Sequence, residues 1–155
     1  MTSVEPNVPG DLSAFEASVV ELIRSLGLLQ PHQTPCGQPL HVSQAHALRE
    51  IAANPGMSQQ GLATELGLAR TTVSELVTAL VARGWVERWR VDSDRRLRCL
   101  KLTAAGESVE RDVSASRRAL LGDIFASVEE SERTAFVAVL QKLSGAARGA
   151  RTAVR

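Results

Sequence analysis

The pattern of residues 58–103 constrains the fold more than any other feature of this chain. Residues 58–66 predict a short helix that ends at a glycine, and residues 68–84 predict a second helix with apolar residues at spacings of three and four. Two strand-like segments follow, at 85–91 and 97–102, on either side of the charged turn Asp92-Ser-Asp-Arg-Arg96. Two helices joined by a tight turn and followed by a basic hairpin are the parts of a winged helix-turn-helix. In that architecture one helix enters a DNA groove and the hairpin contacts the neighbouring backbone or minor groove.

Upstream of this module the sequence predicts a helix, a loop and a second helix. Apolar residues recur at helical spacing over 12–26, which is typical of a helix with one apolar face. The segment 30–41 holds three prolines and one glycine and is expected to be a loop. Ser43 is the expected N-cap of a helix that ends near residue 53. The core side of that helix is predicted to consist of Leu48, Ile51 and Ala52.

Downstream of the module the sequence predicts two further helices. Thr103 is the expected cap of a long helix that continues to about residue 126, with apolar residues along one stripe. A last helix is expected over 129–147, and residues 148–155 are expected to fray. The predicted fold is therefore mainly α with a small β-hairpin wing.

The domain organisation follows from where the apolar stripes lie. Residues 40–103 are predicted to form the DNA-binding module, and residues 1–10 a loose arm. The stripes in 11–30 and 104–147 lie outside the core of the module and need another surface. A second copy of the chain supplies one most economically, so both segments are predicted to be the dimerisation helices of a homodimer. A larger monomeric helical domain is the alternative.

Composition narrows the class of protein. At 155 residues, with 44% apolar and 23% charged residues, the chain suits a single globular domain. No apolar run approaches the roughly 20 residues of a membrane span, the N-terminus has no secretory pattern, and two cysteines make no disulfide framework. We therefore expect a cytoplasmic protein with no membrane partner. The sequence contains no phosphate-binding loop, catalytic triad pattern or paired carboxylates in an apolar setting, so we predict neither an enzyme nor a cofactor.

The charge distribution favours a nucleic-acid partner. The net charge is only +1, but residues 83–101 hold seven basic and three acidic residues, a local net charge of +4. A basic patch on a nearly neutral protein suits a surface that faces phosphates, although a solvated hairpin with many arginines is the simpler alternative. The polar face of the 68–84 helix supplies candidate DNA contacts at Arg70, Thr71, Ser74 and Thr78, with Glu75 among them. Ser58 and Gln59 are the predicted contacts to the DNA backbone.

Several short motifs in order resemble the MarR family of bacterial transcriptional regulators. They are Leu-Ala-Thr-Glu-Leu-Gly-Leu at 62–68, Arg-Thr-Thr-Val-Ser at 70–74, Leu-Val-Ala-Arg-Gly-Trp-Val-Glu-Arg at 80–88, Asp-Arg-Arg at 94–96 and Leu-Thr-Ala-Ala-Gly at 102–106. The resemblance is close over about residues 40–106 and extends to the flanking helices by pattern. It implies a homodimeric repressor that binds a double-stranded, pseudo-palindromic DNA operator and is released by a small-molecule ligand.

The resemblance also assigns roles to individual residues. It places Arg70, Thr71, Thr72 and Ser74 at bases and phosphates of the major groove, and Asp94 and Arg96 match the wing motif. Asp94 can hold an arginine fork, while Arg95 or Arg96 enters the minor groove; Arg98 is a further predicted wing contact. Glu75 departs from the family pattern. It either pairs with a neighbouring Arg or accepts a hydrogen bond from a cytosine amino group.

The sensor of such a regulator is less defined by sequence. The resemblance places a ligand between the dimerisation helices and the DNA-binding module, where the candidate region includes Cys36, His41 and His46. These are ligand types for zinc, but no His follows residue 46, so the set used by zinc-sensing relatives is incomplete and no metal site is predicted. Redox sensing through Cys36 or Cys99 is a second alternative. A winged helix that binds a protein partner instead of DNA is the third.

Overall fold

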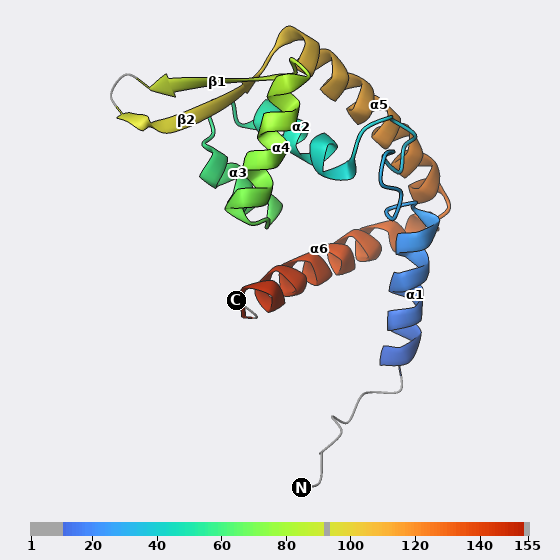
Figure 1. Ribbon diagram of the computed structural model, residues 1–155. Coiled ribbons are helices and arrows are strands. Elements are labelled where there is room, and N and C mark those ends of the chain that lie inside the picture. Colours follow the sequence, from blue (N-terminus) through green and yellow to red (C-terminus); the bar gives the residue numbers. More distant parts are fainter. Residues whose placement is uncertain (1–10, 92–93, 154–155) are drawn as a thin grey trace, which may run out of the picture. The chain divides into compact units, whose positions relative to one another are not determined.

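The computed structural model describes residues 11–91 and 94–153 of the chain (Figure 1). Its element order is α1 (Leu12–Ser25), α2 (Val42–Ala53), α3 (Gln59–Leu66), α4 (Arg70–Ala82), β1 (Val86–Val91), β2 (Asp94–Leu102), α5 (Ala104–Ala126) and α6 (Glu130–Ala153). The chain divides within α5 into two compact units, one up to Arg117 and one from Arg118 onwards. The predicted arm, residues 1–10, lies outside the described residues.

The core of the first unit lies between α2, α3, α4 and the hairpin of β1 and β2. Its largest fully buried side chains include Leu48, Ile51, Leu62, Leu80 and Leu100, which come from each of the three helices and from β2. Burying a side chain of this size contributes about 1.5–3 kcal/mol. Ala52 is exposed, contrary to the sequence prediction, because Ala45 and Ala47 occupy the core side of α2 instead. This core confirms the predicted winged helix-turn-helix.

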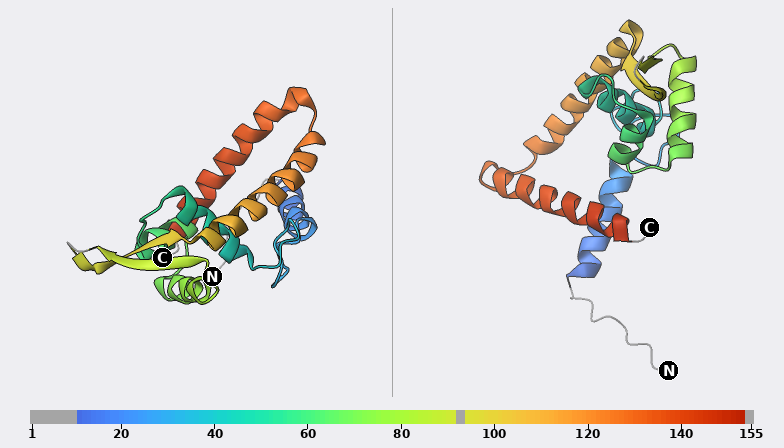
Figure 2. Two further views of the ribbon diagram at one scale, coloured as in Figure 1. Left: turned by 90° about the horizontal axis from the view of Figure 1, so that it is seen from above. Right: turned by 90° about the vertical axis from the view of Figure 1, so that its left-hand side faces the viewer.

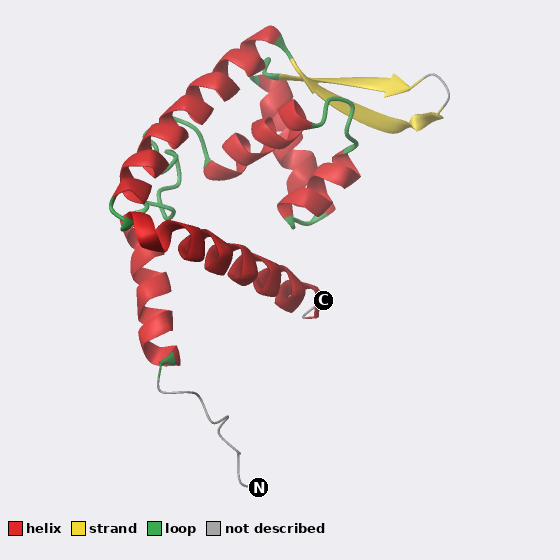
Figure 3. Cartoon of the chain, turned by 180° about the vertical axis from the view of Figure 1, so that it is seen from behind, coloured by secondary structure: helices red, strands yellow, loops and turns green. Residues whose placement is uncertain are grey.

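The hairpin is antiparallel and extends beyond the helices of the core, as Figures 2 and 3 show. Val86 pairs with Leu102 and Arg88 with Leu100, and the register shifts after Arg90. The second strand begins at Asp94 rather than at the predicted residue 97, because the register shift pairs Asp94 with Val91. The residues of the predicted charged turn from Asp94 onwards therefore belong to a strand.

A short segment before α3 bonds to β2 through its backbone. The Leu100 N–H donates to the Met57 carbonyl at 2.9 Å, and the Leu100 carbonyl accepts from the Gly56 N–H at 2.9 Å. Ser58 forms an isolated antiparallel bridge with Cys99. These bonds tie the start of α3 to the hairpin, so the first helix of the helix-turn-helix and the wing share one backbone network.

The helix caps agree with the sequence at α3 and differ at α2. Ser58 accepts the Gly61 N–H at 2.9 Å, as predicted for an N-cap. At α2 the cap is His41, whose Nδ1 accepts the Ser43 N–H at 3.2 Å, while Gln44 accepts the His41 N–H at 3.2 Å. Ser43, the predicted cap, lies inside the helix instead.

A glycine ends α3 before the α3–α4 turn, and another glycine follows the end of α4 before the hairpin. Gly67 has φ 62° and Gly84 has φ 71°. After α4 the Trp85 N–H donates to the Leu80 carbonyl at 3.1 Å and the Gly84 N–H to the Val81 carbonyl at 2.9 Å. This is the hydrogen-bond pattern of a Schellman motif, which requires a left-handed residue. The predicted recognition helix therefore lies between two glycines whose left-handed backbone follows from the local sequence.

The second unit contains the end of α5 and the whole of α6. α6 continues to Ala153, so the predicted fraying from residue 148 is wrong up to that point. Gly145 and Gly149 lie within α6 and do not end it. Phe136, Val139, Leu140 and Leu143 are all 40–51% exposed within this unit and form an uncovered apolar face. No helix in residues 11–91 and 94–153 is long and apolar enough to cross a membrane.

Two glycines of α5 allow the packing at its start to be tested. Gly106 lies against the Trp85 carbonyl, where a Cβ would overlap that oxygen, whereas a Cβ at Gly122 meets nothing within 4 Å. We expect Gly106→Ala to lower the free energy of unfolding by roughly 1–3 kcal/mol or more, because the Trp85 backbone must move. Gly122→Ala is the matched control and should raise it by about 0.5–1 kcal/mol through helix propensity. Urea denaturation measures both, and equal effects would contradict the close approach.

Candidate nucleic-acid interface

Helix α4 presents one buried face and one exposed face. Val73, Leu76, Val77 and Leu80 point into the core. Because these residues occupy the i, i+3, i+4 and i+7 positions, the residues between them face outward. The exposed set contains the predicted contacts Arg70, Thr71, Thr72, Ser74 and Thr78. The structure therefore brings all five together on one polar helix face.

The start of α4 adds backbone donors to this face. Ala69 is the N-cap and provides no side-chain hydrogen bond to the first turn. A helix N-terminus has N–H groups without intrahelical partners and a partial positive charge. Arg70, Thr71 and Thr72 surround this end. The local chemistry therefore suits contact with an anionic group such as a phosphate.

Thr78 is more constrained than its sequence position indicates. Its hydroxyl donates to the Ser74 carbonyl at 2.8 Å and accepts from Arg88 Nη2 at 2.9 Å. The side chain is thus held within the protein rather than free to read a base. Arg88 was not among the predicted contacts. Its position two residues after the buried Val86 in a strand is the signal that could have directed attention to it.

Glu75 lies exposed on the same helix face. The described part of the chain contains one ion pair, between Lys101 and Glu87 at 2.7 Å, and Glu75 is not in it. Among the described side chains, which exclude those of residues 90–98, no arginine pairs with Glu75. Of the two predicted roles, the contact to a cytosine amino group needs no partner within the protein.

The predicted backbone contacts lie at the start of α3. The Ser58 hydroxyl oxygen caps the helix and the Ser58 backbone bridges to Cys99, so this residue has a structural role. Its hydroxyl hydrogen can still be donated outward. Gln59 is half-buried and is the first residue of α3.

The wing residues are located by their backbone. Asp94, Arg95, Arg96 and Arg98 lie in β2, but their side chains, like residues 92–93, lie outside what is described. Three basic residues of this region have described local partners. Lys101 pairs with Glu87, Arg88 donates to Thr78, and the Arg83 guanidinium lies 4.8 Å from the centroid of the Trp85 ring. Of these three partners, only Glu87 is a carboxylate.

The proposed sensor residues have separate partners. Cys36 lies in a loop that docks on α5, with its Sγ 3.2 Å from Thr34 Oγ1 and 3.9 Å from the Val113 carbonyl. His41 caps α2, and His46 lies on that helix. Among the described residues no three His, Cys, Asp or Glu side chains gather as metal ligands. The structure thus does not bring Cys36, His41 and His46 together.

A pocket of about 360 Å³ lies beside His41. It is lined by the loop before α2, the first turn of α2 and the end of α4, through Pro31, His32, Pro39, Leu40, His41, Gln44 and Arg83. Because His41 Nδ1 accepts a hydrogen bond from the Ser43 N–H, its Nε2 carries the proton and is a donor in the neutral ring. The lining combines apolar side chains with cationic and donor groups and contains no carboxylate.

Comparison with known proteins gives one family and several structural neighbours. A profile of the MarR family matches residues 38–97. The transcriptional repressor MprA of Escherichia coli K12 is 29% identical over 94 residues, which cover 61% of this chain and 53% of MprA. The chain spans about half the length of the first curated relatives it matches.

Two solved structures illustrate the fold-level likeness. FabT of Streptococcus pneumoniae, in complex with DNA, matches this chain with a TM-score of 0.70 at 20% identity. The match covers 89% of this chain and 96% of the FabT chain. PcaV of Streptomyces coelicolor, in complex with its natural ligand, matches with a TM-score of 0.64 at 24% identity. The match covers 95% of this chain and 99% of the PcaV chain. The fold and the polar face of α4 define a winged helix-turn-helix protein. Within that class, residues 38–97 are similar to the MarR family, whose profile they match.

His46 allows a test of the electrostatics of α2. Desolvation by its neighbours lowers the pKa of His46 below its usual 6.5, and the positive charges of Arg49 and Arg117 lower it further against an opposing effect of Glu50. Above pH 6.5 the ring is neutral in both folded and unfolded chains. Below it the unfolded chain binds the proton more readily, so the free energy of unfolding falls as pH decreases. We expect His46→Gln to weaken this fall in urea denaturation between pH 7.5 and 5; an unchanged profile would contradict the assignment.

Proposed function

We propose that this protein is a sequence-specific DNA-binding transcriptional regulator in which α4 is the recognition helix. The observation that carries the proposal is the exposed polar face of α4, beside a hairpin that extends beyond the core. A helix of this kind in the major groove can donate to base edges through Arg70 and the hydroxyls of Thr71, Thr72 and Ser74. FabT, a structural neighbour, was solved with DNA, and MprA, a sequence relative, is a repressor. Repression is the mode of regulation we infer for this chain.

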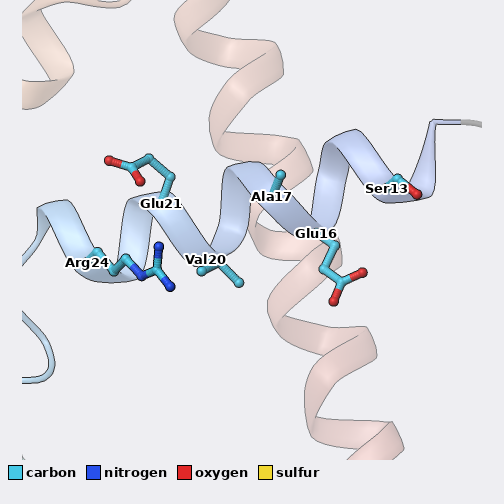
Figure 4. Close-up of a pocket in the computed structure, with 6 residues that line it drawn as sticks. All are labelled: Ser13, Glu16, Ala17, Val20, Glu21 and Arg24. Carbon is cyan, nitrogen blue, oxygen red and sulfur yellow. The ribbon is translucent and has the colours of Figure 1, made fainter.

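The proposed assembly is a homodimer. On α1, Phe15, Val19, Leu22 and Ile23 are 37–50% exposed, and α6 carries the apolar face described above. A further face of α1 is mostly polar and consists of Ser13, Glu16, Ala17, Val20, Glu21 and Arg24 (Figure 4). Covering the apolar stripes of surface helices removes them from water and so lowers the free energy of the assembly. A second copy covers them with the same residues and places two copies of α4 on two half-sites.

The proposed signal is a small molecule. The pocket beside His41 is of the size that small ligands occupy, and it touches Arg83 at the end of α4. A ligand there would contact both the loop before α2 and the C-cap of the recognition helix. PcaV was solved with a natural ligand. Metal and redox responses stay as alternatives from the sequence.

The experiment that tests the proposal measures binding of the protein to a pool of random-sequence duplexes, followed by recovery of the bound fraction and titration against salt. We expect an enriched pseudo-palindromic sequence and an affinity that falls steeply with salt, because lysine and arginine displace counterions from phosphates. Loss of binding on addition of a chelator would instead favour the metal alternative. A protein that enriches no sequence and binds every duplex equally would refute sequence-specific regulation.

The enriched duplex allows Arg70 to be tested in the same assay. Arg70→Ala should reduce discrimination at one base pair per half-site by about 1–3 kcal/mol, whereas Arg111→Ala on the exposed side of α5 should change nothing. An equal loss of affinity for matched and mismatched duplexes would show that Arg70 contacts the backbone only.

The dimer is tested by charge on the α6 face. Leu140→Asp places a carboxylate on the apolar stripe and should convert dimers to monomers in sedimentation velocity, because an unpaired charge would be buried at the interface. Lys142→Asp changes an exposed residue of the same helix and should stay dimeric. A dimeric Leu140→Asp variant would place the interface elsewhere.

A further inference from the structure

Arg88 is half-buried, although charged side chains are mostly exposed unless they are paired. It lies in β1 opposite Leu100, which is fully buried, and two residues after Val86, which is 2% exposed. Residues two apart in a strand, and residues paired across an antiparallel ladder, share one face of the sheet. The Arg88 side chain therefore leaves the sheet on its core-facing side. Its stem runs along the edge of the core, and its guanidinium reaches α4.

At α4 the guanidinium is held by a chain of two hydrogen bonds. Arg88 Nη2 donates to Thr78 Oγ1 at 2.9 Å, and the Thr78 hydroxyl donates to the Ser74 carbonyl at 2.8 Å. Because the hydroxyl hydrogen is committed to Ser74, an oxygen lone pair is left to accept from Arg88. Thr78 thus orients the guanidinium before any ligand arrives, which lowers the entropy lost on binding.

Among the side chains that the structure describes, Arg88 has a single hydrogen-bond acceptor, Thr78. A guanidinium has five N–H donors, of which Thr78 accepts one. The Nε atom is buried and has no partner among the described residues. No described carboxylate lies within 4.0 Å, since the ion pair in that part of the chain joins Lys101 to Glu87. The half-buried guanidinium therefore lies beside the polar face of α4 with no described counter-ion.

We infer that Arg88 is a DNA-contacting residue that donates to a phosphate where α4 meets the hairpin, and that Thr78 is its positioning residue. The inference rests on the proposed function. A phosphate fits better than a base because Thr78 lies beyond the middle of α4, whereas recognition helices contact base edges through their N-terminal residues. A planar, unpaired guanidinium also matches the geometry of a phosphate.

The test compares three variants on the duplex that the wild-type protein enriches, with affinity measured from 50 to 300 mM salt. Arg88→Met keeps an apolar stem and removes the charge. We expect an affinity loss of about tenfold or more at low salt, and a salt slope smaller in magnitude by about 0.9 per lost phosphate contact. Thr78→Val removes the acceptor and should lower affinity with the slope unchanged, because the charge persists. Thr78→Ser keeps the hydroxyl and should restore binding.

The outcomes separate this inference from the proposed function. If wild-type protein enriches no duplex, the proposed function fails and the inference with it. If wild-type binds and Arg88→Met loses affinity with an unchanged salt slope, Arg88 has only a structural role and the inference fails. Wild-type affinity in Arg88→Met would also overturn it. Urea denaturation of each variant identifies unfolding, and Arg88→Lys, which keeps the charge without the fork, should retain the slope and lose affinity.

Discussion

The interface depends on one apolar stripe, through which α4 packs against α2, α3 and the hairpin. Val73, Val77 and Leu80 are at most 1% exposed, and they fix the rotation of α4 about its own axis. Since that rotation also decides which residues face outward, the hydrophobic effect sets the polar face without any contact to it. If the apolar stripe were shifted by one position along α4, the helix would rotate about its axis and Arg70 and Ser74 would face the core.

A compact junction then connects α4 to the wing and to α5. The Thr103 hydroxyl donates to the Gly84 carbonyl at 2.6 Å, and its oxygen accepts the Gly106 N–H at 3.1 Å. The Thr103 N–H donates to the Trp85 carbonyl at 3.0 Å. These hydrogen bonds hold together the end of α4, the start of β1 and the start of α5 as one rigid junction. In the proposed mechanism this rigidity links a ligand near Arg83, or the helices that form the dimer, to the position of the recognition helix.

The contacts of each basic side chain, and not the number of basic residues, decide which charges of the module can meet a ligand. Lys101 is paired with Glu87, Arg83 lies over Trp85, and Arg88 is held by a neutral hydroxyl. Of these three, only Lys101 has a carboxylate partner, so Arg83 at the end of α4 and Arg88 beside it both carry a charge with no described counter-ion. Local composition indicates that phosphates are a suitable ligand, but contacts decide which side chains can meet them.

The sequence by itself determined the order of the elements, the phase of α4, the cap at Ser58 and the glycine-terminated ends at Gly67 and Gly84, because each depends on residues close together in the chain. It misplaced the start of β2 and the cap of α2, where a register shift and an imidazole acceptor decide, and it ended α6 too early. Only the tertiary structure placed Arg88 on Thr78 and separated Cys36 from His41 and His46. These placements depend on how β1 packs beside α4 and how the loop before α2 packs on α5, and no local periodicity encodes them.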